Sequence, residues 1–466
     1  MKLHFLGANK QVTGSRYVLE AGGLNIMIDC GLVQERKFLH RNWEPCPFPP
    51  DKIDLLLLTH AHLDHCGLIP RFVVNGFNGP IITVEPSVEL AEIVMRDSGR
   101  LHEEDAKYKK KRHQREGRKG PHPEDPLYTE QDAERAVSLL RGVQYKESIP
   151  LNKNVTAHFH QAGHILGAAS IEITAKENGQ TKHIVFSGDV GQWDNPLLSD
   201  PQLLNRADYA IMESTYGDRL HKDNGDIDQQ LERIIKDTAS KGGNILIPTF
   251  AIERAQELLY HIGNLVRENR IPNLPVFLDS PMAVDVTKVF HRHCGYLNEA
   301  TRCDVARHVE ALRFPGLRLT KSVEDSKAIA EIKGSAIIMA GSGMCTGGRI
   351  KHHLRANLTR PESSVLFVGY QAEGTLGRII LQGTNPVRIH GREWEVNAKL
   401  EQVHGLSAHG DREDLLKWLG GCEIPPKKLY LTHGETSAAE ALAKRIRDEK
   451  GWDVDVPGYG HVADLT

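Results

Sequence analysis

The stretch THAHLDH directly follows the apolar run IDLLLL (53–58), and it places three histidines and an aspartate within six positions. A continuous apolar run is typical of a strand covered on both faces. His60 and His62 project to the same side of an extended chain. Asp64 and His65 follow where the chain turns toward a helix. One histidine here would usually be a packed residue, but this density favours two neighbouring metal ions, with zinc preferred over manganese or iron.

Other predicted strand ends carry further candidate ligands. His164 in AGHILGAAS, Asp189 in FSGDVG and His433 in LYLTHGE each lie beside a glycine after an apolar run. Each alone fits a turn residue or a helix cap as well as a ligand, but together they indicate one constellation at the carboxyl ends of strands. His158 and His160 compete as candidates. They alternate within a predicted strand, which favours packing or support of the ligands.

Composition bounds the class of protein. A chain of 466 residues is long enough for two or three domains, and 40% hydrophobic with 26% charged residues is typical of a globular protein. No apolar run approaches a signal peptide or a membrane span of roughly 20 residues. Seven cysteines without a CxxC pair favour a reducing compartment, and we expect a cytoplasmic protein. The net charge of −3 means that any polyanionic partner must bind to local patches.

The order of predicted elements suggests one domain interrupted by another. The first third reads as short strands with turns between them, including a hairpin around Ala21-Gly22-Gly23. Strands then alternate with helices, as in a parallel α/β layer. After Trp394 short strands return. The simplest division is a β-rich domain that the chain leaves for an α/β domain and later completes.

A basic run, KYKKKRHQREGRK (107–119), carries eight lysines and arginines against one glutamate. One interpretation is a solvated helical insert, which we favour because such runs are common. The other is an electrostatic contact for a phosphate backbone. Apart from Tyr108, no aromatic residue is interleaved to stack on bases, so the role of this insert stays open.

Several motifs together resemble a known family. THAHLDH, AGH, SGD and LTHG resemble the metal motifs of the metallo-β-lactamase fold. IMESTYG, GLSAHGD and LTHGE resemble the three motifs of its β-CASP branch, and GSGMCTGGRI and GYQAEGTLGR resemble stretches of the inserted domain. Within this branch, the chain resembles prokaryotic ribonucleases that are homologues of the endonuclease subunit of the pre-mRNA cleavage and polyadenylation complex. The resemblance implies an α/β (α+β) fold, an αββα sandwich (1–208 and 395–466) with an inserted α/β β-CASP domain (209–394).

The resemblance also implies roles for single residues. One zinc would be held by His60, His62 and His164, and the second by Asp64, His65 and His433, with Asp189 bridging them. Asp29 in MIDCG would orient ligands from behind. Glu213 and His409 match a carboxylate–histidine pair beside the metals. We place His409, Glu213 and Asp64 among the catalytic residues, with His409 as general acid.

The implied activity is hydrolysis of phosphodiester bonds in single-stranded RNA by two Zn²⁺ per chain, with Mn²⁺ as the alternative metal. Cleavage would be endonucleolytic, with 5′-to-3′ exonuclease action as a further option, and would leave 5′-phosphate and 3′-hydroxyl ends. The inserted domain would act as a lid. We expect the substrate-binding residues to be Arg349, Lys351, Arg378 and Ser407, although the charged ones fit solvated helix positions equally well.

Three rival functions remain. A hydrolase of small thioesters or lactones uses similar ligands, but the long insert and the pair Glu213 and His409 speak against it. A non-catalytic RNA-binding scaffold is disfavoured by the complete ligand set. A DNA-processing nuclease differs only in substrate. The sequence implies no membrane partner, and a homodimer is an assembly that it allows.

Overall fold

The computed structural model divides into two compact units. Unit 1 comprises Met1–Leu220 with His409–Thr466, and unit 2 comprises His221–Ala408. The structure describes residues 1–117, 124–177, 179–221, 226–306, 312–369 and 371–466. Within these ranges, no helix combines the length and apolar character that a membrane crossing requires.

Unit 1 is a sandwich of two seven-stranded sheets. The first sheet has the order β22 (Val462–Asp464), β1 (Lys2–Gly7), β2 (Arg16–Ala21), β3 (Leu24–Ile28), β4 (Leu55–Leu57), β5 (Ile81–Val84) and β6 (Leu140–Val143). The second has the order β21 (Val454–Asp455), β20 (Lys428–Thr432), β11 (Tyr209–Glu213), β10 (Gln180–Phe186), β9 (Ala169–Glu177), β8 (Val155–Gln161) and β7 (Ile149–Pro150). The predicted hairpin is confirmed as β2 and β3, which pair antiparallel across the turn.

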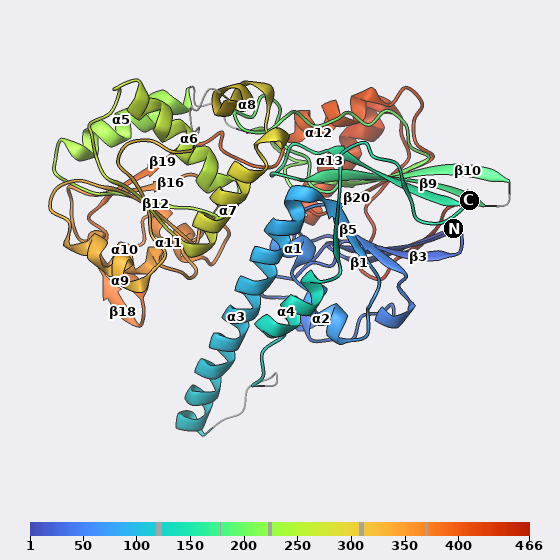
Figure 1. The fold of residues 1–466 in the computed structure, drawn as a ribbon, viewed down its shortest axis with the longest axis horizontal. Helices are drawn as coiled ribbons and strands as arrows, with labels where there is room; N and C mark the ends of the chain where they lie inside the picture. Colours follow the sequence, from blue (N-terminus) through green and yellow to red (C-terminus); the bar gives the residue numbers. More distant parts are fainter. Residues whose placement is uncertain (118–123, 178, 222–225, 307–311, 370) are drawn as a thin grey trace. The chain divides into compact units, whose positions relative to one another are not determined.

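Helices lie against the sheets from outside (Figure 1). The described helices of unit 1 are α1 (Leu63–Cys66), α2 (Ile69–Val74), α3 (Glu85–Glu116), α4 (Glu130–Val137), α12 (Arg412–Trp418) and α13 (Thr436–Lys450). On the second sheet, Leu415 and Trp418 of α12 and Leu442 of α13 join Met212 and Leu431 in one buried cluster. The C-terminal helices therefore anchor strand β20, which ends next to the predicted ligand His433.

The direction of the strands brings the predicted motif loops together. Strands β3 and β4 run parallel, as do β10, β11 and β20. Parallel strands end at the same edge of a sheet, and ligands in open α/β sheets bind there. The loops after β4, β10 and β20 carry THAHLDH, SGD and LTHG. The predicted αββα sandwich thus places the motif residues at one edge.

Helix α3 begins at Glu85 and continues through most of the basic run to Glu116. Figure 1 shows its C-terminal turns extending away from the sandwich. Lys107, Lys110, Lys111 and Arg115 are exposed there, whereas His113 is buried and its Nδ1 lies 2.9 Å from Glu124 Oε1. The predicted helical insert is confirmed for the described residues, whereas Arg118 and Lys119 lie outside them.

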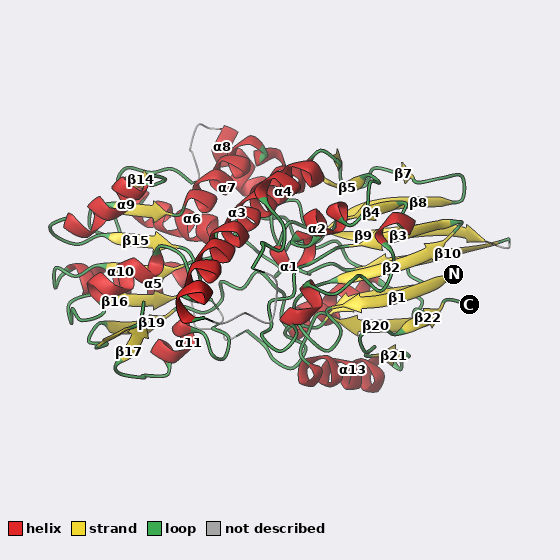
Figure 2. Cartoon of the chain, turned by 90° about the horizontal axis from the view of Figure 1, so that it is seen from below, coloured by secondary structure: helices red, strands yellow, loops and turns green. Residues whose placement is uncertain are grey.

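Unit 2 contains a six-stranded parallel sheet with helices around it (Figure 2). The sheet order is β14 (Leu317–Leu319), β13 (Val276–Asp279), β15 (Ile337–Ala340), β12 (Ile245–Pro248), β16 (Ser364–Phe367) and β19 (Lys399–Gln402). Its described helices are α5 (Ile227–Ala239), α6 (Arg254–Arg267), α7 (Pro281–Arg292), α8 (Glu299–Ala306), α9 (Val323–Ala328), α10 (Ile350–Asn357) and α11 (Leu376–Leu381), and β17 (Val387–Ile389) pairs with β18 (Arg392–Trp394). The predicted inserted α/β layer is confirmed.

The units divide at different residues from the predicted segments. Strand β11 (Tyr209–Glu213) pairs with β10 and β20 in unit 1, and β19 (Lys399–Gln402) pairs with β16 in unit 2. The compact units accordingly separate after Leu220 and Ala408. The predicted domain limits at 209 and 394 stay predictions.

Candidate metal centre

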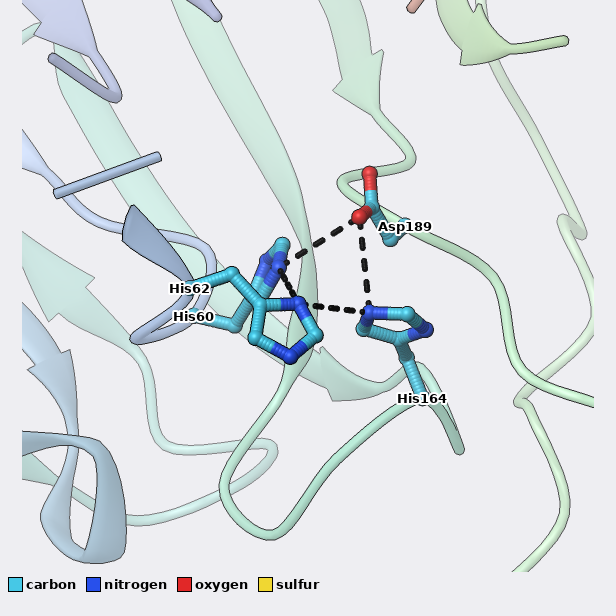
Figure 3. Close-up of side chains that lie close together, drawn as sticks. All are labelled: His60, His62, His164 and Asp189. Atoms are coloured by element: carbon cyan, nitrogen blue, oxygen red, sulfur yellow. Dashed lines mark hydrogen bonds and ion pairs between the residues drawn. The ribbon is translucent and has the colours of Figure 1, made fainter. Parts of the chain in front are cut away.

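Four side chains of unit 1 form the first cluster (Figure 3). His60 and His62 come from the loop after β4, His164 from the loop after β8 and Asp189 from the loop after β10. His62 Nδ1 lies 3.1 Å from His60 Nε2 and 3.0 Å from His164 Nε2. Asp189 Oδ2 lies 3.4 Å from Nε2 of both His60 and His164. Three imidazole nitrogens and a carboxylate oxygen therefore converge on one point.

A second cluster adjoins the first and shares its aspartate. His65 Nε2 lies 3.1 Å from His433 Nε2 and 3.3 Å from Asp189 Oδ1. His433 Nε2 lies 3.4 Å from Asp64 Oδ2 and 3.6 Å from Asp189 Oδ1. The two oxygens of Asp189 thus face different clusters.

These spacings fit divalent metal ions. A tetrahedral zinc with bonds of about 2.0–2.1 Å holds neighbouring ligand atoms about 3.3 Å apart. The measured separations of 3.0 to 3.6 Å scatter around that value. Asp189 is buried, and its Oδ1 accepts no hydrogen bond from the described residues. A buried carboxylate oxygen without a donor needs a cation, which the donor set around it can hold.

The charge states of the three imidazoles in the first cluster agree with this role. Burial lowers the pKa of His60 to about 3 and that of His62 to about 4, and it holds the pKa of His164 well below its usual range. Histidine must be neutral to bind a metal through a ring nitrogen. The first cluster therefore offers lone pairs without a prior loss of protons near neutral pH.

Asp29 contacts His65 of the second cluster through its carboxylate. Its Oδ2 accepts a hydrogen bond of 2.7 Å from His65 Nδ1, and Thr59 donates its backbone N–H (2.8 Å) and its hydroxyl to the same carboxylate. His60 Nδ1 lies 3.0 Å from the Thr59 hydroxyl. Second-sphere hydrogen bonds of this kind fix which ring nitrogen faces the metal.

A close backbone approach holds this support in place. Cys30 donates its backbone N–H to the His65 carbonyl at 2.7 Å. A Cβ at Gly31 would lie 1.6 Å from the Asp64 carbonyl oxygen, so only glycine fits there. The ligand loop and the loop after β3 are therefore locked together.

Thr215 supports His433 and was missed by the sequence analysis. Its hydroxyl lies 3.1 Å from His433 Nδ1 and donates to the His433 carbonyl at 3.0 Å. Thr59, which contacts His60, was also not singled out. Thr59 belongs to the motif THAHLDH and Thr215 to IMESTYG. The triplet Leu-Thr-His, which ends at His60 and again at His433, was the one sequence signal that pointed to Thr59.

His409 and Glu213 pair beside the clusters. His409 Nδ1 lies 3.1 and 3.2 Å from the two oxygens of Glu213, which is buried and accepts the Val190 N–H at 2.7 Å. The Asp189 carboxylate is 3.9 Å from the same His409 nitrogen. Burial lowers the pKa of His409, but Glu213 and Asp189 raise it more, to about 9. The pair can therefore hold a proton next to the candidate metal ions.

The predicted substrate-binding residues lie in unit 2. Arg349 donates to Asp279 at 2.7 Å and to the Lys321 carbonyl at 2.6 Å, so its guanidinium is already engaged within that unit. Lys351 and Arg378 are half-buried on α10 and α11, and Ser407 is half-buried two residues before His409. Their contact with substrate stays a prediction.

His158 and His160 lie outside the clusters. Both are on β8, and His160 Nε2 lies 3.0 Å from Glu172 Oε2. His183 Nδ1 lies 3.0 Å from the other oxygen of Glu172. Of the two predicted roles, packing or support of the ligands, this network within the sheet fits packing for His160.

Three family models match successive parts of the chain. A metallo-beta-lactamase superfamily domain matches residues 18–215, and a Beta-Casp domain matches residues 255–380. A Zn-dependent metallo-hydrolase RNA specificity domain matches residues 393–457. The metallo-beta-lactamase match contains six of the seven candidate ligands, and the third match contains His433.

Three curated relatives match nearly all of this chain. The chain is 36% identical to ribonuclease TTHA0252 of Thermus thermophilus over 99% of both chains. It is 28% identical to transcription termination factor FttA of Methanocaldococcus jannaschii, over 96% of this chain and 69% of that one. An RNase J-like protein of the same archaeon is also 28% identical, over 95% of each chain.

A solved structure agrees on the fold. A protein of unknown function from Enterococcus faecalis V583 superposes with a TM-score of 0.53 over 99% of both chains at 14% identity, which shows the fold alone. The family matches, the full-length relatives and the two ligand clusters agree with one another. This chain belongs to the β-CASP family of metallo-β-lactamase-fold, metal-dependent hydrolases.

Proposed function

We propose that this protein is a zinc-dependent ribonuclease with two Zn²⁺ per chain that cleaves single-stranded RNA internally, with 5′-to-3′ exonuclease action as a second mode to be tested. The observation that carries the proposal is the pair of ligand clusters bridged by Asp189 with the His409–Glu213 pair beside them. This is the arrangement expected for hydrolysis of a phosphodiester, in which charge must be offset and a leaving oxygen protonated.

Each ligand has a defined part in the proposal. His60, His62 and His164 would hold one ion, and Asp64, His65 and His433 the other, with Asp189 shared. When bound, the ions would supply a hydroxide nucleophile from water at neutral pH and offset the charge of the phosphodiester. Asp29, Thr59 and Thr215 keep the imidazoles oriented through their second ring nitrogens.

His409 is proposed as the general acid. Glu213 engages its Nδ1 and thereby fixes the ring, which directs Nε2 toward the opposite side. A proton held on this ring would pass to the 3′-oxygen as the bond to phosphorus breaks, which leaves 5′-phosphate and 3′-hydroxyl ends. Positioned proton transfer of this kind contributes about 10²- to 10⁴-fold to a rate.

The assignment of RNA as substrate is supported by the comparisons. The model that matches residues 393–457 describes an RNA specificity domain, and the full-length relative from Thermus thermophilus is named a ribonuclease. The length of unit 2 adds to this support, since a hydrolase of small esters needs no insertion of that size.

The proposal is tested with purified, zinc-loaded protein and uniformly labelled single-stranded RNA. We expect internal cleavage by the wild type and a loss of about 10²- to 10⁴-fold in His409→Ala, with an unchanged zinc content. Single-stranded DNA of the same sequence and a small thioester serve as parallel substrates. Faster turnover of either one than of RNA would contradict the assignment, and cleavage by His409→Ala at the wild-type rate would exclude this histidine as the acid.

A further inference from the structure

Three arginines of unit 1 line one surface pocket away from the metal clusters. Arg16 begins strand β2, Arg41 lies on a 3₁₀ turn (Leu39–Asn42), and Arg71 lies on helix α2. The pocket opens to solvent and has a volume of about 20 Å³ for the centres of water-sized molecules, and none of the candidate metal ligands lines it. We call it the arginine pocket.

Arg16 is the buried cation of this pocket. Arg16 is only 8% exposed, and its guanidinium contacts the thiols of Cys46, 3.7 Å from Nη1, and of Cys30. Its buried Nε has no hydrogen-bond partner among the described residues. Cys30 also lines the pocket, but burial raises the pKa of its thiol to about 12, so it stays neutral. A buried guanidinium without a counter-ion is unfavourable, which indicates that an anion belongs beside it.

Among the described residues, the partners of Arg41 are uncharged. Its Nη1 donates to Gln11 Oε1 at 2.7 Å. Its guanidinium lies 4.2 Å from the ring centre of Phe38 and 4.1 Å from that of Tyr459. Stacking between two rings orients the cation without neutralising it.

Arg71 is held in the same way. Its two terminal nitrogens donate to the carbonyls of Leu127 and Trp43, each at 3.1 Å. Within the described part of the chain, no carboxylate lies within 4.0 Å of any of the three guanidinium groups. The three cations are therefore fixed by neutral groups and face a shared space.

One acidic residue, Glu44, lines the same pocket. Its carboxylate lies 4.0 Å from His40 Nε2, and both side chains are about half exposed. Three arginines against one partly exposed glutamate leave a surplus of positive charge. Guanidinium groups bind phosphate oxygens through paired hydrogen bonds, which suits this surplus.

We propose that the arginine pocket is a binding site for a tetrahedral oxyanion of the phosphate class, either free inorganic phosphate or a phosphate group of a polynucleotide. The site is independent of the metal clusters, and it does not depend on the proposed ribonuclease activity. Its three cations come from a strand, a 3₁₀ turn and a helix, so an anion bound there would tie these elements together.

Calorimetric titration of the zinc-loaded protein with inorganic phosphate at constant ionic strength tests the site. Arg41→Gln and Arg16→Met should each weaken this binding by about 10- to 100-fold, because each removes a charge-assisted hydrogen bond. Glu44→Gln should strengthen it by removing a repelling charge. The exposed Arg206, outside the pocket, provides the control Arg206→Gln, which should bind phosphate as the wild type does.

Phosphate bound at the metal ions would be common to all variants, so only the difference between them reports on the pocket. A single-stranded RNA with a cleavage-resistant backbone is titrated in parallel. Weaker RNA binding by Arg41→Gln would identify a polynucleotide phosphate as the ligand, and unchanged RNA binding with weakened phosphate binding would identify the free ion. Equal phosphate affinity of the wild type and Arg41→Gln would overturn the proposal, even if Arg16→Met failed to fold.

Discussion

Two buried aspartates, one in each unit, show how differently the same side chain can be used. Asp279 ends strand β13 in unit 2 and receives hydrogen bonds from Arg349 (2.7 Å), His353 (2.7 Å) and Ser326 (2.6 Å). Asp189 in unit 1 is equally buried, but imidazole nitrogens at 3.3 to 3.6 Å surround it. The first carboxylate is neutralised by its own chain, whereas the second belongs to a donor set that only a cation completes.

This difference separates a structural carboxylate from a functional one better than burial or position in the fold does. Asp279 ends a strand of a parallel pair and Asp189 follows one, and both lie at the edge where ligands usually bind. The identity of the neighbouring groups decides whether the carboxylate is structural or can bind a metal. The Arg349 guanidinium neutralises Asp279, whereas the imidazole nitrogens around Asp189 offer lone pairs that can bind a metal ion.

The largest effect should come from Asp189→Asn, because the amide offers one oxygen where the carboxylate offers two. We expect RNA cleavage to fall to background and the metal content per chain to drop, as measured by elemental analysis. Asp279→Asn is the matched control, and it should keep the full metal content. Equal metal content in the two variants would remove the distinction between these aspartates.

Asp279→Asn should instead destabilise the fold. Removal of one partner from a buried ion pair costs about 3–5 kcal/mol, because Arg349 is left without its anion. Chemical denaturation followed by circular dichroism measures this loss as a lower midpoint of the transition that belongs to unit 2. A midpoint equal to that of the wild type would mean that the Asp279 cluster adds nothing to stability.

A smaller effect is expected from Thr215→Val, which keeps the shape of the side chain but removes the hydroxyl that accepts from His433 Nδ1. Loss of such a support lowers metal affinity about 10- to 100-fold. Competition with a chelator of known affinity measures it. Thr215→Ser retains the hydroxyl and should bind metal as the wild type does, so a matching loss in both variants would point to packing instead.

The smallest expected effect is a pH dependence of the stability that Asp279 gives to unit 2. Burial raises the pKa of Asp279, but hydrogen bonds from His353, Ser326 and Arg349 lower it by a larger amount. The pKa therefore ends below its ordinary value of 3.8. A carboxyl whose pKa falls on folding adds stability above its ordinary pKa and loses it as pH drops through the lowered value. The gap in unfolding free energy between the wild type and Asp279→Asn should therefore narrow below pH 3.8. A constant gap throughout the acid range would contradict this.

The sequence was most informative where several ligand-type residues recur in short motifs. The density of imidazoles in THAHLDH predicted a metal site, and the resemblance to the family's metal motifs grouped His60, His62 and His164 on one ion. Thr59 and Thr215 were missed, since a threonine near a histidine in sequence is ordinary and only the fold brings its hydroxyl to the ring.

Long-range pairing explains other gaps. Arg349 was predicted to bind substrate, and nothing local reveals that Asp279, 70 positions earlier, engages its guanidinium. Helix α7 (Pro281–Arg292) was not predicted, although Ser280 accepts a hydrogen bond from the Ala283 N–H as an N-cap. The full length of α3 could not be inferred from the sequence, because its C-terminal turns lack the apolar periodicity from which a helix is usually inferred.

The central claim is that Asp189 bridges two metal ions, and crystallography with anomalous scattering at the zinc edge tests it most directly. The account predicts two zinc peaks per chain, about 3.5–4 Å apart. One peak should lie among His60, His62 and His164, the other among Asp64, His65 and His433, with one Asp189 oxygen on each. A single peak, or two peaks with Asp189 bound to neither, would contradict it.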